Sequence, residues 1–190
     1  MTASQAAAAD SHLSADSGPQ PRTAATTTAG AAGSLGPLAG LVIERLLVSD
    51  DVAASKYGTD SPIEDPVREE QVLAQVRQEA AEAGVDPDAA TDFFRDQITA
   101  SKVVQRGLYD RWAAHPDEAP TTRPDLARIR ERLDRLTTAL LHELKETERV
   151  REQPVACTVR LALAGATGAA REHLDGLHRR ALRTATESVC

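Results

Sequence analysis

The stretch from residue 87 to residue 114 constrains the fold of this chain more than any other. One face of it carries Phe94, Ile98, Ser101, Gln105, Leu108 and Trp112, at spacings of 4, 3, 4, 3 and 4 residues. This spacing is typical of an amphipathic α-helix packed on a core. Two polar residues, Ser101 and Gln105, lie in the middle of the face that should be buried. The sequence therefore predicts a long helix that brings polar groups into the interior.

Aspartate–proline pairs mark where two helices begin. Asp86-Pro87 precedes the helix over 87–114, and Asp65-Pro66 precedes another that runs to Gly84. Aspartate is a favoured N-cap, proline fits the first turn, and glycine commonly ends a helix. Helical periodicity also covers about 36–57, where Ser49-Asp50 offers a fresh N-cap that would divide the helix, and about 124–151. Residues 155–190 read as two helices separated near Gly165–Gly168.

No segment shows the alternation of a β-strand, and no internal repeat is present. Residues 1–34 form an Ala/Thr/Ser-rich tract that we expect to be a disordered tail, because it has too little apolar surface to offset its ordering entropy. The fold class predicted for residues 35–190 is all-α, a single-domain bundle of about six helices.

Charge and composition argue against several functions. The net charge of −7 gives no electrostatic basis for a nucleic-acid partner. No apolar run approaches the ~18–20 residues that a membrane span needs. We predict no metal, because His173 and His178 are five residues apart on different helix faces and no other cluster has ligand spacing. A phosphate-binding glycine loop and a Ser-His-acid nucleophile are also missing, so the sequence shows no group that would attack a bound anion.

Polar residues gather on the helix faces that should turn inward. Arg45 and Lys56 are eleven residues apart, close to three helical turns, so they share one face about 16 Å apart. With them we place Arg68, Ser101, Gln105 and Arg130, and beside them Asp65 and Glu69. Each has an ordinary explanation when taken alone, such as an arginine extending to water or an aspartate capping a helix. Together the cations exceed the acids, which favours a ligand with two carboxylates.

The cysteines leave two readings open. Cys157 and Cys190 could form a disulfide that fixes the chain terminus, or they could be two free thiols. A disulfide would indicate an oxidising compartment. The first thirty residues do not resemble a signal peptide, so either a leader has been removed or the protein stays in the cytoplasm.

These residues resemble the active-site pattern of AroQ-type chorismate mutases, and of the secreted (gamma) subclass in particular. The phrases ERLxVxDxVAxxK, PIED, DPDxxTxxFxDQIxA, PDLxxxR and HLDxLxxRALxTATxSxC carry the resemblance over about residues 36–190. It implies an all-helical enzyme that rearranges chorismate to prephenate without a cofactor. It also implies a Cys157–Cys190 disulfide, a homodimer and an exported protein.

The resemblance further implies a role for each polar residue. Arg45, Arg68 and Arg130 would bind carboxylates, with help from Ser101. Lys56 and Gln105 would donate to the ether oxygen, and Asp65 and Glu69 would position the ring hydroxyl. This chain departs from many secreted relatives, which have Glu in place of Gln105 and Thr in place of Ser101. Two alternatives remain. One is a related enzyme such as an isochorismate–pyruvate lyase or an aminodeoxychorismate mutase, and the other is a non-catalytic helical binding protein.

Overall fold

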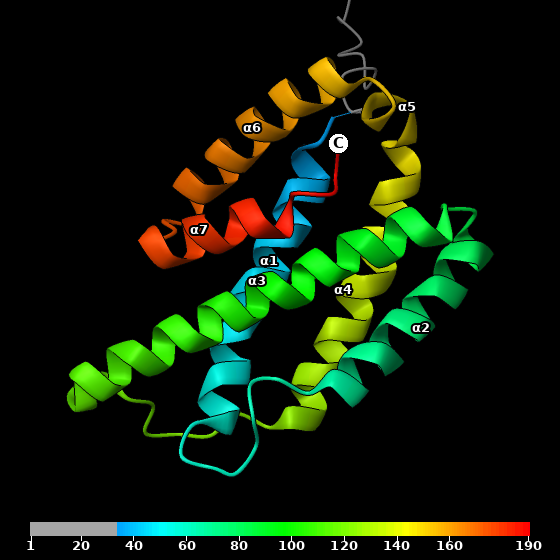
Figure 1. Ribbon diagram of the computed structural model, residues 1–190. Helices are drawn as coiled ribbons and strands as arrows, with labels where there is room; N and C mark the ends of the chain where they lie inside the picture. The colour runs from blue at the N-terminus through cyan, green and yellow to red at the C-terminus, as the bar shows by residue number, and fades with distance from the viewer. Residues whose placement is uncertain (1–33) are drawn as a thin grey trace, which may run out of the picture.

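A computed structural model describes residues 34–190 as a bundle of helices (Figure 1). Within this part of the chain there are seven α-helices, one 3₁₀-helix and no strand. They are α1 (Gly36–Lys56), α2 (Pro66–Ala83), α3 (Pro87–Ala114), η2 (Pro116–Glu118), α4 (Leu126–Glu146), α5 (Glu148–Arg151), α6 (Pro154–Arg171) and α7 (Gly176–Ala185). The all-α prediction is confirmed. The disordered tail expected over residues 1–34 lies outside the described residues, except for Ser34.

Aspartate caps begin four of the helices. Asp65 accepts a hydrogen bond from the backbone N–H of Arg68, and Asp86 accepts two from the first turn of α3. Asp125 and Asp175 cap α4 and α7 in the same way. Gly84 then ends α2 in the left-handed conformation, with φ of 67°. The predicted bounds of α2 and α3 are therefore confirmed.

Helices α1 and α3 cross at the centre of the bundle, and every other long helix packs on one of them (Figure 1). The core between them includes Val42, Leu46, Phe94 and Val104, all nearly inaccessible to solvent. Helices α2 and α4 pack on one side of this crossing, and α6 and α7 on the other. The crossing therefore divides the molecule into two halves that share one core.

Two predicted helix breaks are wrong. Helix α1 passes through Ser49-Asp50 without interruption, because the Ser49 hydroxyl is buried against Ser101 and caps nothing. Helix α6 passes through Gly165–Gly168 and ends only at Arg171. Gly168 lies where a Cβ would be 2.5 Å from Ile43 Cδ1, so this glycine serves the close approach of α6 to α1.

The helix expected over 124–151 is shorter than predicted. Helix α4 ends at Glu146, and the one-turn helix α5 follows after Thr147. The Thr147 hydroxyl donates to the carbonyl of Glu143 within the last turn of α4. This extra segment raises the helix count to seven, one more than the predicted six.

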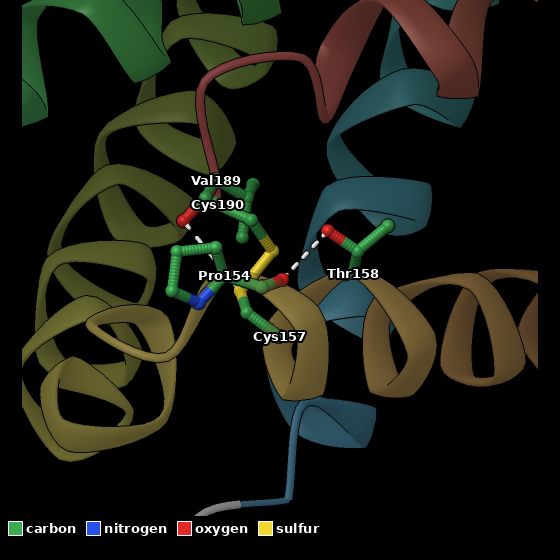
Figure 2. The surroundings of a disulfide bond; sticks show 5 residues. All are labelled: Pro154, Cys157, Thr158, Val189 and Cys190. Carbon is green, nitrogen blue, oxygen red and sulfur yellow. Dashed lines mark hydrogen bonds between the residues drawn. A yellow bond between two sulfur atoms is a disulfide. The ribbon is translucent and has the colours of Figure 1, made fainter.

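The disulfide between Cys157 and Cys190 is present (Figure 2). It joins the first turns of α6 to the last residue of the chain across 33 positions, with 5.7 Å between the Cα atoms. Beside it, the Thr158 hydroxyl donates to the carbonyl of Pro154 (Figure 2). The bond fixes the segment after α7 against α6, and of the two readings the disulfide is the right one.

Candidate active site

A cavity of about 220 Å³ lies among α1, α2, α3 and α4. All eight polar residues that the sequence suggested line it: Arg45, Lys56, Asp65, Arg68, Glu69, Ser101, Gln105 and Arg130. They come from four helices and the segment before α2, so only the folded chain brings them together. Their convergence on one cavity is what the proposed dicarboxylate site requires.

Arg45 is the most desolvated cation of the cavity. Its guanidinium donates to the carbonyl of Leu133 at 3.2 Å and to the Thr137 hydroxyl at 3.5 Å, both neutral acceptors. It also lies 5.5 Å from the centroid of the Phe94 ring. Burial lowers the pKa of Arg45 to about 10, although nearby Asp134 opposes this change. Among residues 34–190, no carboxylate therefore lies within ion-pair distance of the Arg45 side chain to neutralise its charge.

Lys56 ends α1 at the rim of the cavity. Its ammonium donates to the carbonyl of Pro62 at 2.9 Å, which holds the loop before α2 against α1. Burial lowers the pKa of Lys56, and Arg130 lowers it further, while Asp65 and two glutamates act in the opposite direction. Arg68 and Arg130 line the same cavity from its exposed edge. The cations therefore extend from the buried end of the cavity to its opening.

The acidic residues are held by the start of α2. Asp65 caps the helix through the N–H of Arg68, and its own N–H donates to Glu69 Oε1 at 3.4 Å. Glu69 Oε2 accepts from the Lys102 ammonium at 2.8 Å, in an ion pair about three-quarters buried on both sides. The sequence prediction that Asp65 is an N-cap is confirmed, and the cap fixes Glu69 one turn further along.

The sequence did not predict six further polar residues of the lining: Ser49, Gln75, Gln97, Lys102, Asp134 and Thr137. Among them, Lys102 is three positions before Gln105, Ser49 is four after Arg45, and Asp134 is four after Arg130. Helical neighbours at three or four positions share a face, so that spacing could have identified them. Five cations and three acids therefore line the cavity, which leaves an excess of two positive charges: Arg45, Lys56, Arg68, Lys102 and Arg130 against Asp65, Glu69 and Asp134.

Gln105 is 3 % exposed and lies on the α3 wall of the cavity. Its amide nitrogen is 3.1 Å from the Ser101 hydroxyl, which in turn accepts from Ser49 at 2.9 Å. Among residues 34–190 no group of histidine, cysteine or acidic side chains is arranged to hold a metal. None of the helices in this range is long and apolar enough to cross a membrane. The site can bind, orient and polarise a dianion with groups of the chain itself.

Comparison with known proteins agrees with this geometry. Residues 38–106 match the family model for chorismate mutase type II. The chain is 36% identical over 156 residues to a secreted chorismate mutase of Mycobacterium tuberculosis, covering 82% of this chain and 78% of that protein. It is also 36% identical over 163 residues to a secreted chorismate mutase of Mycolicibacterium smegmatis. That match covers 86% of this chain and 90% of the mycobacterial protein. The crystal structure of chorismate mutase from Burkholderia thailandensis superposes with a TM-score of 0.78 at 38% identity, covering 83% of this chain and 99% of that one. The chain therefore belongs to the chorismate mutase type II family and resembles its secreted members.

Proposed function

We propose that this protein converts chorismate to prephenate. The observation that supports this most is the excess of two positive charges on a cavity of about 220 Å³. Chorismate carries two carboxylates, so its charge matches that excess. Its rearrangement breaks the ether C–O bond as a C–C bond forms, within one molecule. The reaction needs a fixed conformation and hydrogen-bond donors at the ether oxygen, and the cavity supplies both kinds of group.

The family resemblance and the position of each side chain support a role for each polar residue. Arg45, Arg68 and Arg130 bind the carboxylates, and Arg45 can do so because, among the described residues, only neutral oxygens accept its hydrogen bonds. Lys56 and Gln105 donate to the ether oxygen, where negative charge develops as the C–O bond breaks. In the same scheme Asp65 and Glu69 position the ring hydroxyl, and Ser101 lines the part of the site that binds a carboxylate.

The magnitudes are adequate for this mechanism. An acceleration of ~10⁶-fold corresponds to about 8 kcal/mol of transition-state stabilisation. Each preorganised donor to a developing negative charge contributes about 3–4 kcal/mol in a site from which water is excluded. Two such donors, with the substrate held in its reactive conformation, therefore supply the required amount.

The direct test is an assay of the purified protein with chorismate, in which prephenate formation and pyruvate release are followed separately. We expect prephenate without pyruvate. Pyruvate release from chorismate or isochorismate would instead indicate a lyase of the same fold. Tight binding of chorismate without turnover would indicate a binding protein that has kept the pocket.

We also propose that the protein is exported and forms a homodimer. The Cys157–Cys190 disulfide suits an oxidising compartment, and the mycobacterial relatives are named secreted. Cell fractionation of a producing culture tests export, with recovery in the cytoplasm as the contrary result. Light scattering of the purified protein tests the dimer, which a mass of 20.3 kDa for the main species would contradict.

A further inference from the structure

A hydrogen-bonded chain of three side chains forms part of the cavity wall. It runs from Ser49 on α1 through Ser101 to Gln105, both on α3. Ser49 is 2 % exposed and donates to Ser101 Oγ at 2.9 Å, which is its only side-chain hydrogen bond in the described part of the chain. Ser49 is thus a buried polar residue that touches the proposed machinery through Ser101.

The donors and acceptors of this chain do not match as the atoms stand. Gln105 Nε2 is 3.1 Å from Ser101 Oγ and 3.3 Å from the Ser101 carbonyl, so both hydrogen bonds of the amide nitrogen go to one residue. Gln105 Oε1 is buried and has no hydrogen-bond partner among the described residues. A hydroxyl group has one hydrogen to donate and can accept two hydrogen bonds. With Ser49 as the donor, Ser101 therefore receives two hydrogen bonds, while its own hydrogen has no acceptor among the described residues.

A half-turn of the Gln105 amide group removes the mismatch. The oxygen and nitrogen of an amide are nearly the same size, so the turn changes no packing. Ser49 then donates to Ser101, and Ser101 donates to Gln105 Oε1. The NH₂ group takes the place of the unpartnered oxygen. The turn breaks the 3.3 Å hydrogen bond to the Ser101 carbonyl and brings two oxygens to that distance, a cost limited by the backbone hydrogen bond that this carbonyl already accepts within the helix.

We propose that Ser49 is a positioning residue that, through Ser101, orients the Gln105 amide so that its NH₂ group donates to the substrate. The inference rests on the proposed function. A hydroxyl that accepts a hydrogen bond becomes a better donor, so the Ser49 bond favours Ser101 as donor to Gln105. Without Ser49, Ser101 has a free lone pair that attracts the NH₂ group. The amide oxygen then faces the cavity, where it repels the ether oxygen.

Ser49→Ala tests this positioning role, with Ser55→Ala as the matched control. Ser55 is also a buried serine of α1, but its hydroxyl donates to the carbonyl of Val52 in its own turn. We expect Ser49→Ala to lower kcat about 10-fold, as for one misdirected hydrogen bond, with KM changed less than about twofold. Ser55→Ala should leave both unchanged. In a Gln105→Leu background, Ser49→Ala should have no further effect on kcat.

A second measurement needs no turnover. The NH₂ signals of Gln105 in an NMR spectrum are identified by their loss in Gln105→Leu, and Ser49→Ala should move them while Ser55→Ala does not. Wild-type kcat together with unmoved NH₂ signals in Ser49→Ala overturns the positioning role. An additive loss in the Gln105→Leu background does so as well. Failure of the wild-type protein to form prephenate overturns the proposed function instead, whatever the NH₂ signals do.

Discussion

His178 on the α7 side and the cations Arg45 and Lys56 on the cavity side have opposite kinds of partner. On the α7 side, His178 is 7 % exposed and lies between Asp175, 2.8 Å from Nδ1, and Asp50, 2.9 Å from Nε2. Asp175 also accepts from Arg111 at 2.8 Å. On the cavity side, within the part of the chain that the structure describes, Arg45 donates only to a carbonyl and a hydroxyl, and Lys56 only to a carbonyl.

The pKa changes follow the same division. Burial lowers the pKa values of Arg45 and Lys56, so their charged forms are destabilised in the free protein. The carboxylates of Asp50 and Asp175 raise the pKa of His178, so its charged form is stabilised. The α7 side therefore uses ion pairs around His178 to hold helices together. The cavity side also contains the Lys102–Glu69 ion pair, but among the described residues Arg45 and Lys56 remain available for an anion that arrives from solution.

Arg45→Met is expected to have the largest effect on activity of the variants that compare the cavity side with the α7 side. It removes a carboxylate ligand, and kcat/KM for chorismate should fall by about 10³-fold, a loss typical of one strong charged contact. The free energy of unfolding should stay the same or rise, because a desolvated cation is replaced by an apolar side chain of similar length. Steady-state kinetics and denaturant unfolding measure the two quantities.

Arg111→Met is the matched control, since Arg111 belongs to the ion pairs on the α7 side. Its activity should remain close to that of the wild type, with a loss of stability of up to about 1 kcal/mol, as for an exposed pair. The comparison fails if Arg45→Met keeps wild-type activity, or if it is the less stable of the two variants.

Loss of the disulfide should lower the free energy of unfolding by about as much as Arg45→Met lowers the stabilisation of the transition state. Replacing both Cys157 and Cys190 by serine releases a loop of 33 residues, which corresponds to about 3–4 kcal/mol in the chain-entropy model. The cavity lies among α1–α4, so kcat of the folded variant should stay close to that of the wild type. Thermal unfolding and kinetics at low temperature separate the two effects, and a large change in kcat would show that the halves are coupled.

The Gln105 amide gives a prediction about pH. An amide donates a hydrogen bond at any pH, whereas a carboxyl group donates only when it is protonated. Wild-type kcat should therefore vary little between pH 6 and 8, and that of Gln105→Glu should fall by about tenfold or more over this range. Equal rates for the two proteins at pH 8 would show that Gln105 is not the donor.

The sequence predicted the cavity better than it predicted the α6–α7 half. Its caps, such as Asp65 and Asp86, are local signals, and the polar residues of the site stand out because they interrupt apolar stripes. Gly168 was misread, because a glycine that allows α6 to approach Ile43 looks the same in sequence as one that ends a helix. The Asp50–His178 contact joins residues 128 positions apart, and no local pattern reports it.

Lys102 does not interrupt an apolar stripe, so the stripe pattern did not single it out, although its spacing from Gln105 could have. Lys102→Met tests whether it supplies part of the charge excess. The substitution removes one positive charge from the cavity and leaves Glu69 without its ion-pair partner. We expect KM for chorismate to rise about 3- to 10-fold with a smaller change in kcat, because the loss concerns binding more than the ether oxygen. Arg106→Met is the control, since Arg106 pairs with Glu64 outside the cavity lining. A similar KM for both variants would remove Lys102 from the site.

The smallest expected effect is the pH dependence of stability that His178 confers. Both of its ring nitrogens face carboxylates, so the charged imidazole donates two hydrogen bonds and the neutral one only one. The raised pKa of His178 means that this stabilisation is fully present below about pH 6.5, the unfolded value, and is lost as the pH rises through the folded value. The Tm difference between wild type and His178→Gln should therefore shrink by about 2–4 °C between pH 6 and 9. His142→Gln, at an exposed position of α4, should show no such trend. If the Tm difference for His178→Gln stays constant with pH, the imidazole is held as a neutral group. The contrast between paired and unpaired charges would then rest on the Arg111–Asp175 ion pair alone.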